Sequence, residues 1–256
     1  MIKEISALEM YSESHCHIGS LNHEAVAKAE EAGVELVLTA GIDVPSSEEA
    51  VRTAASFKIV KGCVGVHPWR ADTYSDSALS TLRELAKEPE VVAISEIGLD
   101  YVGRRTPEGE FTEEYVDPDI QKTALREQIR LAKELGLPVL VHDRTPGEVV
   151  LDILDEEGII EIGAAIHGFS KGPEYARRCE EMGVYISIGK RSIEAGNEDL
   201  MDAIRQTPLE WLLTETDSGD PTGVIVVAEK IAELKGITRE RAGQAATDNL
   251  KRLIGI

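Results

Sequence analysis

The chain of 256 residues is poor in cysteine, in aromatic side chains and in positive charge. Its three cysteines, Cys16, Cys63 and Cys179, are odd in number and far apart, which argues against a disulfide framework and favours a reducing compartment. No apolar run approaches the roughly 20 residues that cross a membrane. Residues 1–4 also lack the basic-then-apolar start of a signal peptide. We therefore expect a cytoplasmic protein with no membrane partner.

The shortage of basic residues constrains what the surface can attract. There are 27 basic against 47 acidic residues, which gives a formal net charge of −20. A surface this acidic repels the phosphates of nucleic acids and membranes, so attraction to a phosphodiester would have to come from a local site. Aromatic residues make up 4% of the chain and offer few surfaces on which bases could stack. If the substrate is a nucleic acid, we expect a short or single-stranded end.

Hydrophobic residues make up 42% of the chain, enough for a sizeable core, and they follow a repeating pattern. Short β-branched runs, which predict strands, occur at residues 8–14, 35–39, 61–66, 92–96, 138–142, 162–167, 184–188 and 210–214. Amphipathic segments, which predict helices, lie at about 22–32, 46–58, 76–87, 119–136, 146–157, 172–182, 197–206 and 222–235, and a last one at 239–253. Glycines 33, 136, 158 and 183 stand where helices should end.

Eight strands that each precede a helix predict an α/β fold, a single (β/α)8 TIM barrel that occupies residues 1–256 as one domain. An open doubly wound sheet is the alternative. It usually has fewer strands and carries a Gly-x-Gly-x-x-Gly phosphate loop, which no predicted strand precedes here. After the fourth strand, residues 99–118 form an unusually long connection, which is either a lid or substrate-contacting loop or a plain surface insertion.

The chain has only six histidines, and most of them stand at strand ends. His15 and His17 are two residues apart on an extended run, so both rings point to one face. His67, His142 and His167 each close an apolar run that predicts a buried strand, whereas His23 falls outside this pattern.

In a barrel the carboxyl ends of the strands meet at one mouth, where active sites lie. The side chains expected there as metal ligands are four imidazoles and two carboxylates: His15, His17, Glu96, His142, His167 and Asp217. This set exceeds the needs of one ion and suits two divalent ions about 3.5–4 Å apart, bridged by a carboxylate and a water. Mixed nitrogen and oxygen ligands favour zinc, manganese, nickel or iron over a pure magnesium site, but the choice among Mg, Mn and Zn stays open.

Several longer motifs contain these residues. They are Ser-His-Cys-His at 14–17, Gly-Val-His-Pro at 65–68, Ser-Glu-Ile-Gly-Leu-Asp-Tyr at 95–101, Pro-Val-Leu-Val-His-Asp-Arg at 138–144, His-Gly-Phe-Ser at 167–170 and Glu-Thr-Asp-Ser at 215–218. With these motifs the chain resembles, over nearly its whole length, the TatD-like metal-dependent deoxyribonucleases of the amidohydrolase-type barrel superfamily. The resemblance implies a metal-dependent phosphodiesterase of the exonuclease type that acts on DNA ends.

The resemblance also implies a role for each site residue. His15 and His17 would hold one ion together with Asp217, Glu96 would bridge the pair, and His142 and His167 would hold the second ion. A hydroxide activated by both ions would attack the phosphorus, with Asp217 orienting it and accepting its proton. His67 would contact the phosphate or the leaving oxygen, although a purely structural role stays open.

The chain departs from the family pattern at three places. Glu13 stands where relatives usually have Asp, Gly168 replaces the usual Cys, and residues 218–220 read Ser-Gly-Asp instead of a Ser-Pro-Tyr-type continuation. None of these positions is an expected metal ligand, so the predicted metal site is unchanged. The loops that contain them line the mouth, so they bear on the choice of substrate.

Basic residues follow several strands directly, which places them at the expected mouth. They are Arg70, Arg104, Arg105, Arg144, Lys171, Lys190 and Arg191. The hypothesis is a locally positive rim that draws a phosphodiester to the metals, with Arg144, His67, Arg104 and Lys171 as substrate contacts. The alternative is that basic residues are simply scattered among loops.

Two other functions stay open. One is a barrel hydrolase of a small-molecule amide, lactone or cyclic imide. Many such enzymes use a carboxylated lysine on the fourth strand, where this chain has Glu96. The other is a metal-binding barrel without catalytic activity. The oligomeric state is not predictable from the sequence.

Overall fold

The computed structural model describes residues 10–19, 22–104, 106 and 110–256. Within them, eight strands form one sheet in the order β1 to β8, and each strand pairs in parallel with the next along the chain. The strands are β1 (Tyr11–Cys16), β2 (Val34–Ala40), β3 (Val60–Val64), β4 (Val91–Asp100), β5 (Val139–Arg144), β6 (Ala164–His167), β7 (Val184–Gly189) and β8 (Leu212–Glu215).

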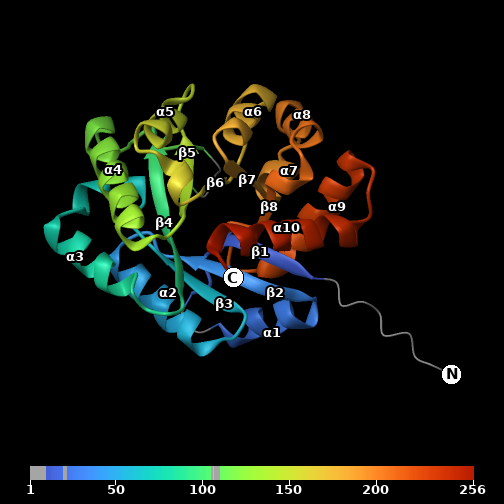
Figure 1. Ribbon diagram of the computed structural model, residues 1–256, viewed down its shortest axis with the longest axis horizontal. Helices are drawn as coiled ribbons and strands as arrows, with labels where there is room; N and C mark the ends of the chain where they lie inside the picture. The colour runs from blue at the N-terminus through green and yellow to red at the C-terminus, as the bar shows by residue number, and fades with distance from the viewer. Residues whose placement is uncertain (1–9, 20–21, 105, 107–109) are drawn as a thin grey trace.

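Helices alternate with these strands and lie around the sheet (Figure 1). The α-helices are α1 (His23–Glu31), α2 (Val44–Ser56), α3 (Asp76–Leu85), α4 (Pro118–Leu135), α5 (Val149–Glu156), α6 (Pro173–Glu181), α7 (Lys190–Glu194), α8 (Glu198–Gln206), α9 (Val224–Lys235) and α10 (Arg239–Ile254). Short 3-10 turns η1 (Pro68–Thr73), η2 (Ile159–Glu161), η3 (Leu209–Trp211) and η4 (Pro221–Gly223) join some of them. This is the predicted (β/α)8 barrel. That all of residues 1–256 form one domain stays a prediction.

The seam between the first and last strands is closed at the mouth by backbone hydrogen bonds. The N–H of Asp217 donates to the carbonyl of His15 at 3.0 Å, and the N–H of His17 donates to the carbonyl of Ser218 at 2.9 Å. The buried side chain of Glu13 supports this seam, because its Oε1 accepts the N–H groups of both His15 and Thr216 at 3.0 and 3.1 Å. The segment after β8 is thereby held against the end of β1.

The opposite end of the barrel is filled by the last helix. Leu250, Leu253 and Ile254 of α10 belong to one buried cluster with strand residues such as Leu38 and Leu140. In Figure 1, α10 lies across β1, and it contacts both β1 and β8. This end is therefore packed with apolar side chains, and the histidines that end the strands lie at the other end.

The strand and helix boundaries depart from the sequence expectation in a few places. Strand β4 extends to Asp100, beyond the predicted 92–96, and the connection to α4 is correspondingly shorter. The first two residues expected in strand eight form part of η3 instead, and the first two expected in strand six follow η2 and precede β6. Helix α7 was not predicted, because five residues are too few to show a helical period. The first two residues of the predicted strand 8–14 lie outside the described residues.

The predicted helix ends are confirmed at the four glycines. Gly136 caps α4 in the left-handed conformation at φ 68°, and glycines 33, 158 and 183 follow their helices with φ of 85°, 67° and 71°. No helix within the described ranges is both long and apolar enough to cross a membrane.

Candidate metal centre

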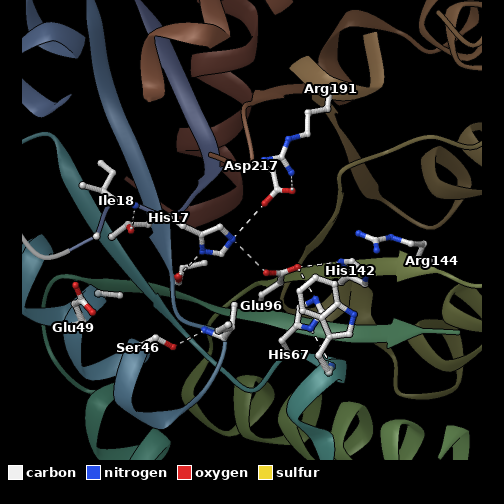
Figure 2. Close-up of a pocket in the computed structure, with 16 residues that line it drawn as sticks. His17, Ile18, Ser46, Glu49, His67, Glu96, His142, Arg144, Arg191 and Asp217 are labelled. Carbon is white, nitrogen blue, oxygen red and sulfur yellow. Dashed lines mark hydrogen bonds and ion pairs between the residues drawn. The ribbon is translucent and has the colours of Figure 1, made fainter. Parts of the chain in front are cut away.

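The carboxylate of Glu96, on β4, lies at the middle of the barrel mouth and faces five histidines, of which Figure 2 shows His17, His67 and His142. Its Oε1 lies 2.7 Å from Nε2 of His167, 3.0 Å from Nδ1 of His142 and 3.1 Å from Nε2 of His67. Its Oε2 lies 3.5 Å from Nε2 of His15 and 3.6 Å from Nε2 of His17. The strand ends thus bring the predicted ligands together around one carboxylate.

A second carboxylate, that of Asp217, approaches the same two rings at the end of β1. Its Oδ1 lies 3.3 Å from Nε2 of His17 and 3.9 Å from Nε2 of His15. Asp217 follows β8 and adopts a φ of 50°, a left-handed conformation that few residues other than glycine take. Its backbone bond to His15 holds this conformation, so the side chain turns into the mouth instead of continuing the strand direction.

The hydrogen bonds of two rings indicate which nitrogen carries the proton. Nδ1 of His17 lies 3.0 Å from the carbonyl of Ala40 and must donate to it, which leaves the lone pair of Nε2 facing the carboxylates. In His67 the arrangement is reversed, because Nδ1 accepts the N–H of Trp69 at 3.0 Å. A neutral His67 therefore donates its Nε2–H to Glu96 and has no lone pair to offer an ion.

The remaining rings fit a divalent cation. Neither ring nitrogen of the fully buried His15 has a hydrogen-bond partner. Nδ1 of His142 and Nε2 of His167 lie 3.2 Å apart and both face Oε1 of Glu96. An orphaned buried imidazole and two converging nitrogens beside a carboxylate form a donor set typical of zinc or manganese.

The donor atoms form two groups, one beside each carboxylate oxygen of Glu96. The first group is His15, His17 and Asp217, whose donor atoms lie within 4.8 Å of one another. The second consists of Glu96, His142 and His167, at the distances given above. His15 also lies within reach of Glu96 and His167, so the two groups adjoin. His67 comes close enough to Glu96 and His142 to form a third group, but its tautomer argues against it as a ligand.

The ionisation of the two carboxylates and the neutrality of His67 suit this arrangement. Burial would raise the pKa of Asp217, but the nearby His17 and His15 rings hold it well below its usual range. The pKa of Glu96 is likewise lowered despite burial, chiefly by His67 and His167. Burial lowers the pKa of His67 to about 4. At neutral pH both carboxylates are therefore ionised and the His67 ring is neutral.

Sequence reasoning did not single out Asp100 among the site residues. This buried residue ends β4, and its Oδ2 lies 3.0 Å from Nε2 of His142, 2.9 Å from the indole nitrogen of Trp69 and 3.3 Å from the guanidinium of Arg144. It thereby fixes the ring nitrogen of His142 that faces away from Glu96. The spacing of four residues from Glu96 on one strand was the available signal, because it places both side chains on the same face.

Glu215 on β8 is a second residue that was missed. Its buried carboxylate lies 3.6 Å from Nδ1 of His167 and accepts the N–H of Gly168 at 2.7 Å. Gly168 has a φ of 57°, so glycine suits this position, where the family pattern usually has cysteine. The glycine that replaces the family's usual cysteine therefore suits the backbone conformation beside the predicted ligand His167.

The basic side chains expected at the rim separate into two sets. Arg144 and Arg191 line a cavity at the centre, and Arg191 lies 3.4 Å from Asp217. Arg104 lies against the ring of Trp69, 5.6 Å from its centroid, and lines a neighbouring hollow.

The other set lines neither cavity at the centre and pairs with groups of the protein. Lys171 bonds to the carbonyl of Thr145 and lies 3.5 Å from Asp143, while Arg70 and Lys190 lie 4.0 and 3.7 Å from acidic side chains. Arg105 lies outside the described residues. Substrate contacts by Arg144, His67, Arg104 and Lys171 stay predictions.

Comparison with known proteins gives a consistent result. The family model described as TatD related DNase matches residues 13–255. A Bacillus subtilis protein named as the uncharacterized metal-dependent hydrolase YabD is 32% identical, covering 96% of this chain and 100% of that protein. The 3'-5' ssDNA/RNA exonuclease TatD of Cronobacter turicensis is 36% identical, covering 76% of this chain and 71% of that protein. The crystal structure of YJJV, a TatD homologue from Escherichia coli K12, superposes with a TM-score of 0.83 at 25% identity, covering 96% of this chain and 98% of that one.

Proposed function

The chain belongs to the TatD-related DNase family, and on this premise we propose that it is a metal-dependent phosphodiesterase that trims DNA ends with two divalent ions. The observation that carries the proposal is the pair of adjoining donor groups around Glu96, whose Oε2 faces His15 and His17 and whose Oε1 faces His142 and His167. His15, His17 and Asp217 would hold one ion and His142 and His167 the other, with Glu96 between them.

Bound divalent ions would supply Lewis acidity, both to activate water and to neutralise charge that develops on the phosphoryl oxygens. Asp217, with its depressed pKa, is ionised at neutral pH and can orient the attacking water and accept its proton. Its positive φ and its backbone bond to His15 hold the carboxylate in place before substrate arrives. Glu96 is ionised as well, and burial among imidazoles keeps it from rotating into solvent.

His67 and Arg144 would act on the substrate. His67 presents an N–H towards the centre, so it can donate to a phosphoryl or leaving oxygen but cannot act as a base through that nitrogen. The guanidinium of Arg144 lines the cavity beside the ligands and can pair with a phosphate in a bidentate manner. Arg104 and Lys171 would bind more distant phosphates only after leaving the contacts that they make here.

We also propose a cytoplasmic protein that acts as one domain over residues 1–256. All three cysteines are buried and unpaired, as is usual in a reducing compartment.

The experiment that tests the proposal is digestion of an end-labelled single-stranded oligonucleotide, with EDTA and then with Mg²⁺, Mn²⁺ or Zn²⁺ restored. We expect metal-dependent shortening, which Asp217→Asn lowers about 10²–10⁴-fold because it removes the proton acceptor. Asp220→Asn is the matched control, since Asp220 is exposed and caps a short turn three residues away. Absence of cleavage with any metal, despite bound ions, would favour a hydrolase of an amide, lactone or cyclic imide.

A further inference from the structure

Two cavities meet at the metal centre, and their walls differ in chemistry. One, of about 410 Å³, extends from the ligands over the ends of β1 and β2 to α2. The other, of about 360 Å³, extends over the ends of β5 to β8. They share His142, Asp217, Arg144, Arg191 and Trp69, so a chain that crosses the centre passes from one cavity into the other. Each volume is typical of a site for a small molecule or one unit of a polymer.

The part of the first cavity beyond His17 is mainly apolar, and we call it the α2 chamber. It is lined by Ile18, Ala40, Ile42, Glu49 and Ala50. Figure 2 shows Ile18 and Glu49 on the His17 side of the ligands, with Arg144 and Arg191 away from them. Apolar walls around a small number of polar groups are the usual surroundings of a bound heterocycle.

The hydroxyl groups of the chamber already accept hydrogen bonds from backbone N–H groups. The Oγ of Ser46 accepts the N–H groups of Ile42 and Asp43 at 2.9 and 3.0 Å in the cap of α2. Oγ1 of Thr39 accepts the N–H of Ile18 at 3.1 Å. The half-buried carboxylate of Glu49 is the charged group that this wall contributes. A carboxylate has about four lone-pair positions, so it can accept from a ligand beside a protein partner.

This charge decides which part of a nucleotide suits the chamber. A carboxylate repels a phosphate, whereas the guanidinium groups of Arg144 and Arg191 attract one. The acidic, apolar side of the centre is therefore suited to a base, and the side with the two arginines is suited to the backbone.

We propose that the α2 chamber binds the base of the terminal nucleotide and that Glu49 selects among bases by their N–H donors. Guanine presents two adjacent donors on its pairing edge, whereas adenine and cytosine present an amino group. Thymine and uracil present one N–H between two carbonyl oxygens, which the carboxylate repels. The expected order is guanine first, then adenine and cytosine, and thymine last. This inference rests on the proposed phosphodiesterase function.

The kinetic test uses single-stranded oligonucleotides that differ only in the terminal base. We expect kcat/KM for a guanine end to exceed that for a thymine end roughly tenfold or more, as for a hydrogen bond to a charged group. Glu49→Gln should bring the two within about threefold of each other, because the amide both donates and accepts. Glu48→Gln is the matched control, since Glu48 is the exposed neighbour on α2 that does not line the cavity, and it should keep the wild-type preference. An unchanged preference in Glu49→Gln, or none in the wild type, would overturn the inference.

A binding test separates this inference from the proposed function, because it needs no turnover. Guanosine and thymidine are titrated calorimetrically into the wild type, Glu49→Gln and Gly19→Phe. Gly19 lines the cavity, and a Cβ placed there would meet no atom within 4 Å, so a phenylalanine can be introduced at the edge of the chamber without a clash at its Cβ. Guanosine should bind more tightly than thymidine and lose affinity in both variants, whereas Gly19→Ala should leave it unchanged.

The two tests have distinguishable failures. Selective guanosine binding without cleavage of any oligonucleotide would support the base site and contradict the nuclease proposal. Cleavage with a base preference and a guanosine affinity that do not respond to Glu49→Gln or Gly19→Phe would support the nuclease proposal and contradict the base site.

Discussion

His142 points Nδ1 towards Glu96 because its other ring nitrogen is held by Asp100 at 3.0 Å. A carboxylate behind a metal-binding histidine fixes both the tautomer and the orientation of the ring. Asp100 can do so because its Oδ1 accepts the N–H groups of Val102 and Gly103, each at 2.9 Å, while Oδ2 also accepts from Trp69. The pKa of Asp100 is held well below its usual range despite burial, chiefly by His142, so the group is ionised at neutral pH.

We predict that Asp100→Asn lowers the affinity of the ion at Glu96, His142 and His167 about 10–100-fold, because the ring loses its charged acceptor. The affinity is measured by competition with a chromophoric chelator. Asp117→Asn, at the exposed N-cap of α4, is the control and should bind both ions as the wild type does. Wild-type affinity at both sites in Asp100→Asn would show that Asp100 does not orient the ring.

The sequence predicted the residues at the centre better than it predicted their geometry. Imidazoles and carboxylates that end buried strands can be recognised by residue type and position, and the structure brings all six predicted ligands together. The roles of Asp100 and Glu215 depend on which ring nitrogen of a histidine each one contacts. The tautomer of His67 depends on the turn at Trp69. Such contacts follow from rotamers and turns, which a one-dimensional pattern does not contain.

At the scale of elements, α10 approaches β1 so closely that only glycine fits at one position. A Cβ on Gly243 would lie 2.6 Å from two ring carbons of Tyr11 and 3.2 Å from the carbonyl oxygen of Met10. Tyr11 is 1% exposed and has little room to move. This contact holds the last helix against the first strand.

Gly243→Ala should therefore destabilise the protein by about 1–3 kcal/mol through overpacking. The usual effect of this change inside a helix has the opposite sign, a gain of about 0.5–1 kcal/mol. The free energy of unfolding is measured by urea denaturation. Asp248→Ala, at an exposed position of the same helix, should stay within about 0.5 kcal/mol of the wild type. A more stable Gly243→Ala variant would mean that α10 can move away from β1.

The elements themselves were largely predictable, because alternating strand and helix periods are strong signals in a parallel barrel. All eight strands lie where the sequence placed them, to within a few residues, for the described part of the chain. The errors fall where periodicity is too short to read, as in the five residues of α7. They also fall where a strand continues through a glycine, as β4 does at Gly98.

At the scale of the whole molecule, a net charge of −20 opposes the approach of a polyanion. Among the described residues, two guanidinium groups, those of Arg144 and Arg191, line the cavities at the centre. Other basic side chains from the expected rim pair with acidic groups nearby. The local positive field is therefore small.

We predict a weak dependence of oligonucleotide binding on salt. About two phosphate contacts correspond to a slope of roughly −1.4 in log K against log salt concentration, from about −0.7 per phosphate on a single strand. Binding is measured by fluorescence anisotropy between about 50 and 200 mM salt, with Asp217→Asn to prevent cleavage. Arg191→Ala should make the slope shallower by about 0.7. A slope of about −4 or steeper would indicate a basic surface that this account lacks.

The central claim is that six side chains hold two divalent ions, and the number of bound ions tests it most directly. The measurement is the metal content per chain by inductively coupled plasma mass spectrometry, after loading with Mn²⁺ or Zn²⁺ and removal of excess ion. We predict two ions in the wild type, one in His142→Ala and two in His67→Ala, because His67 donates a hydrogen bond instead of binding an ion. His23→Ala, at an exposed histidine, should also keep two. One ion or none in the wild type, or the loss of an ion in His67→Ala, would contradict the account.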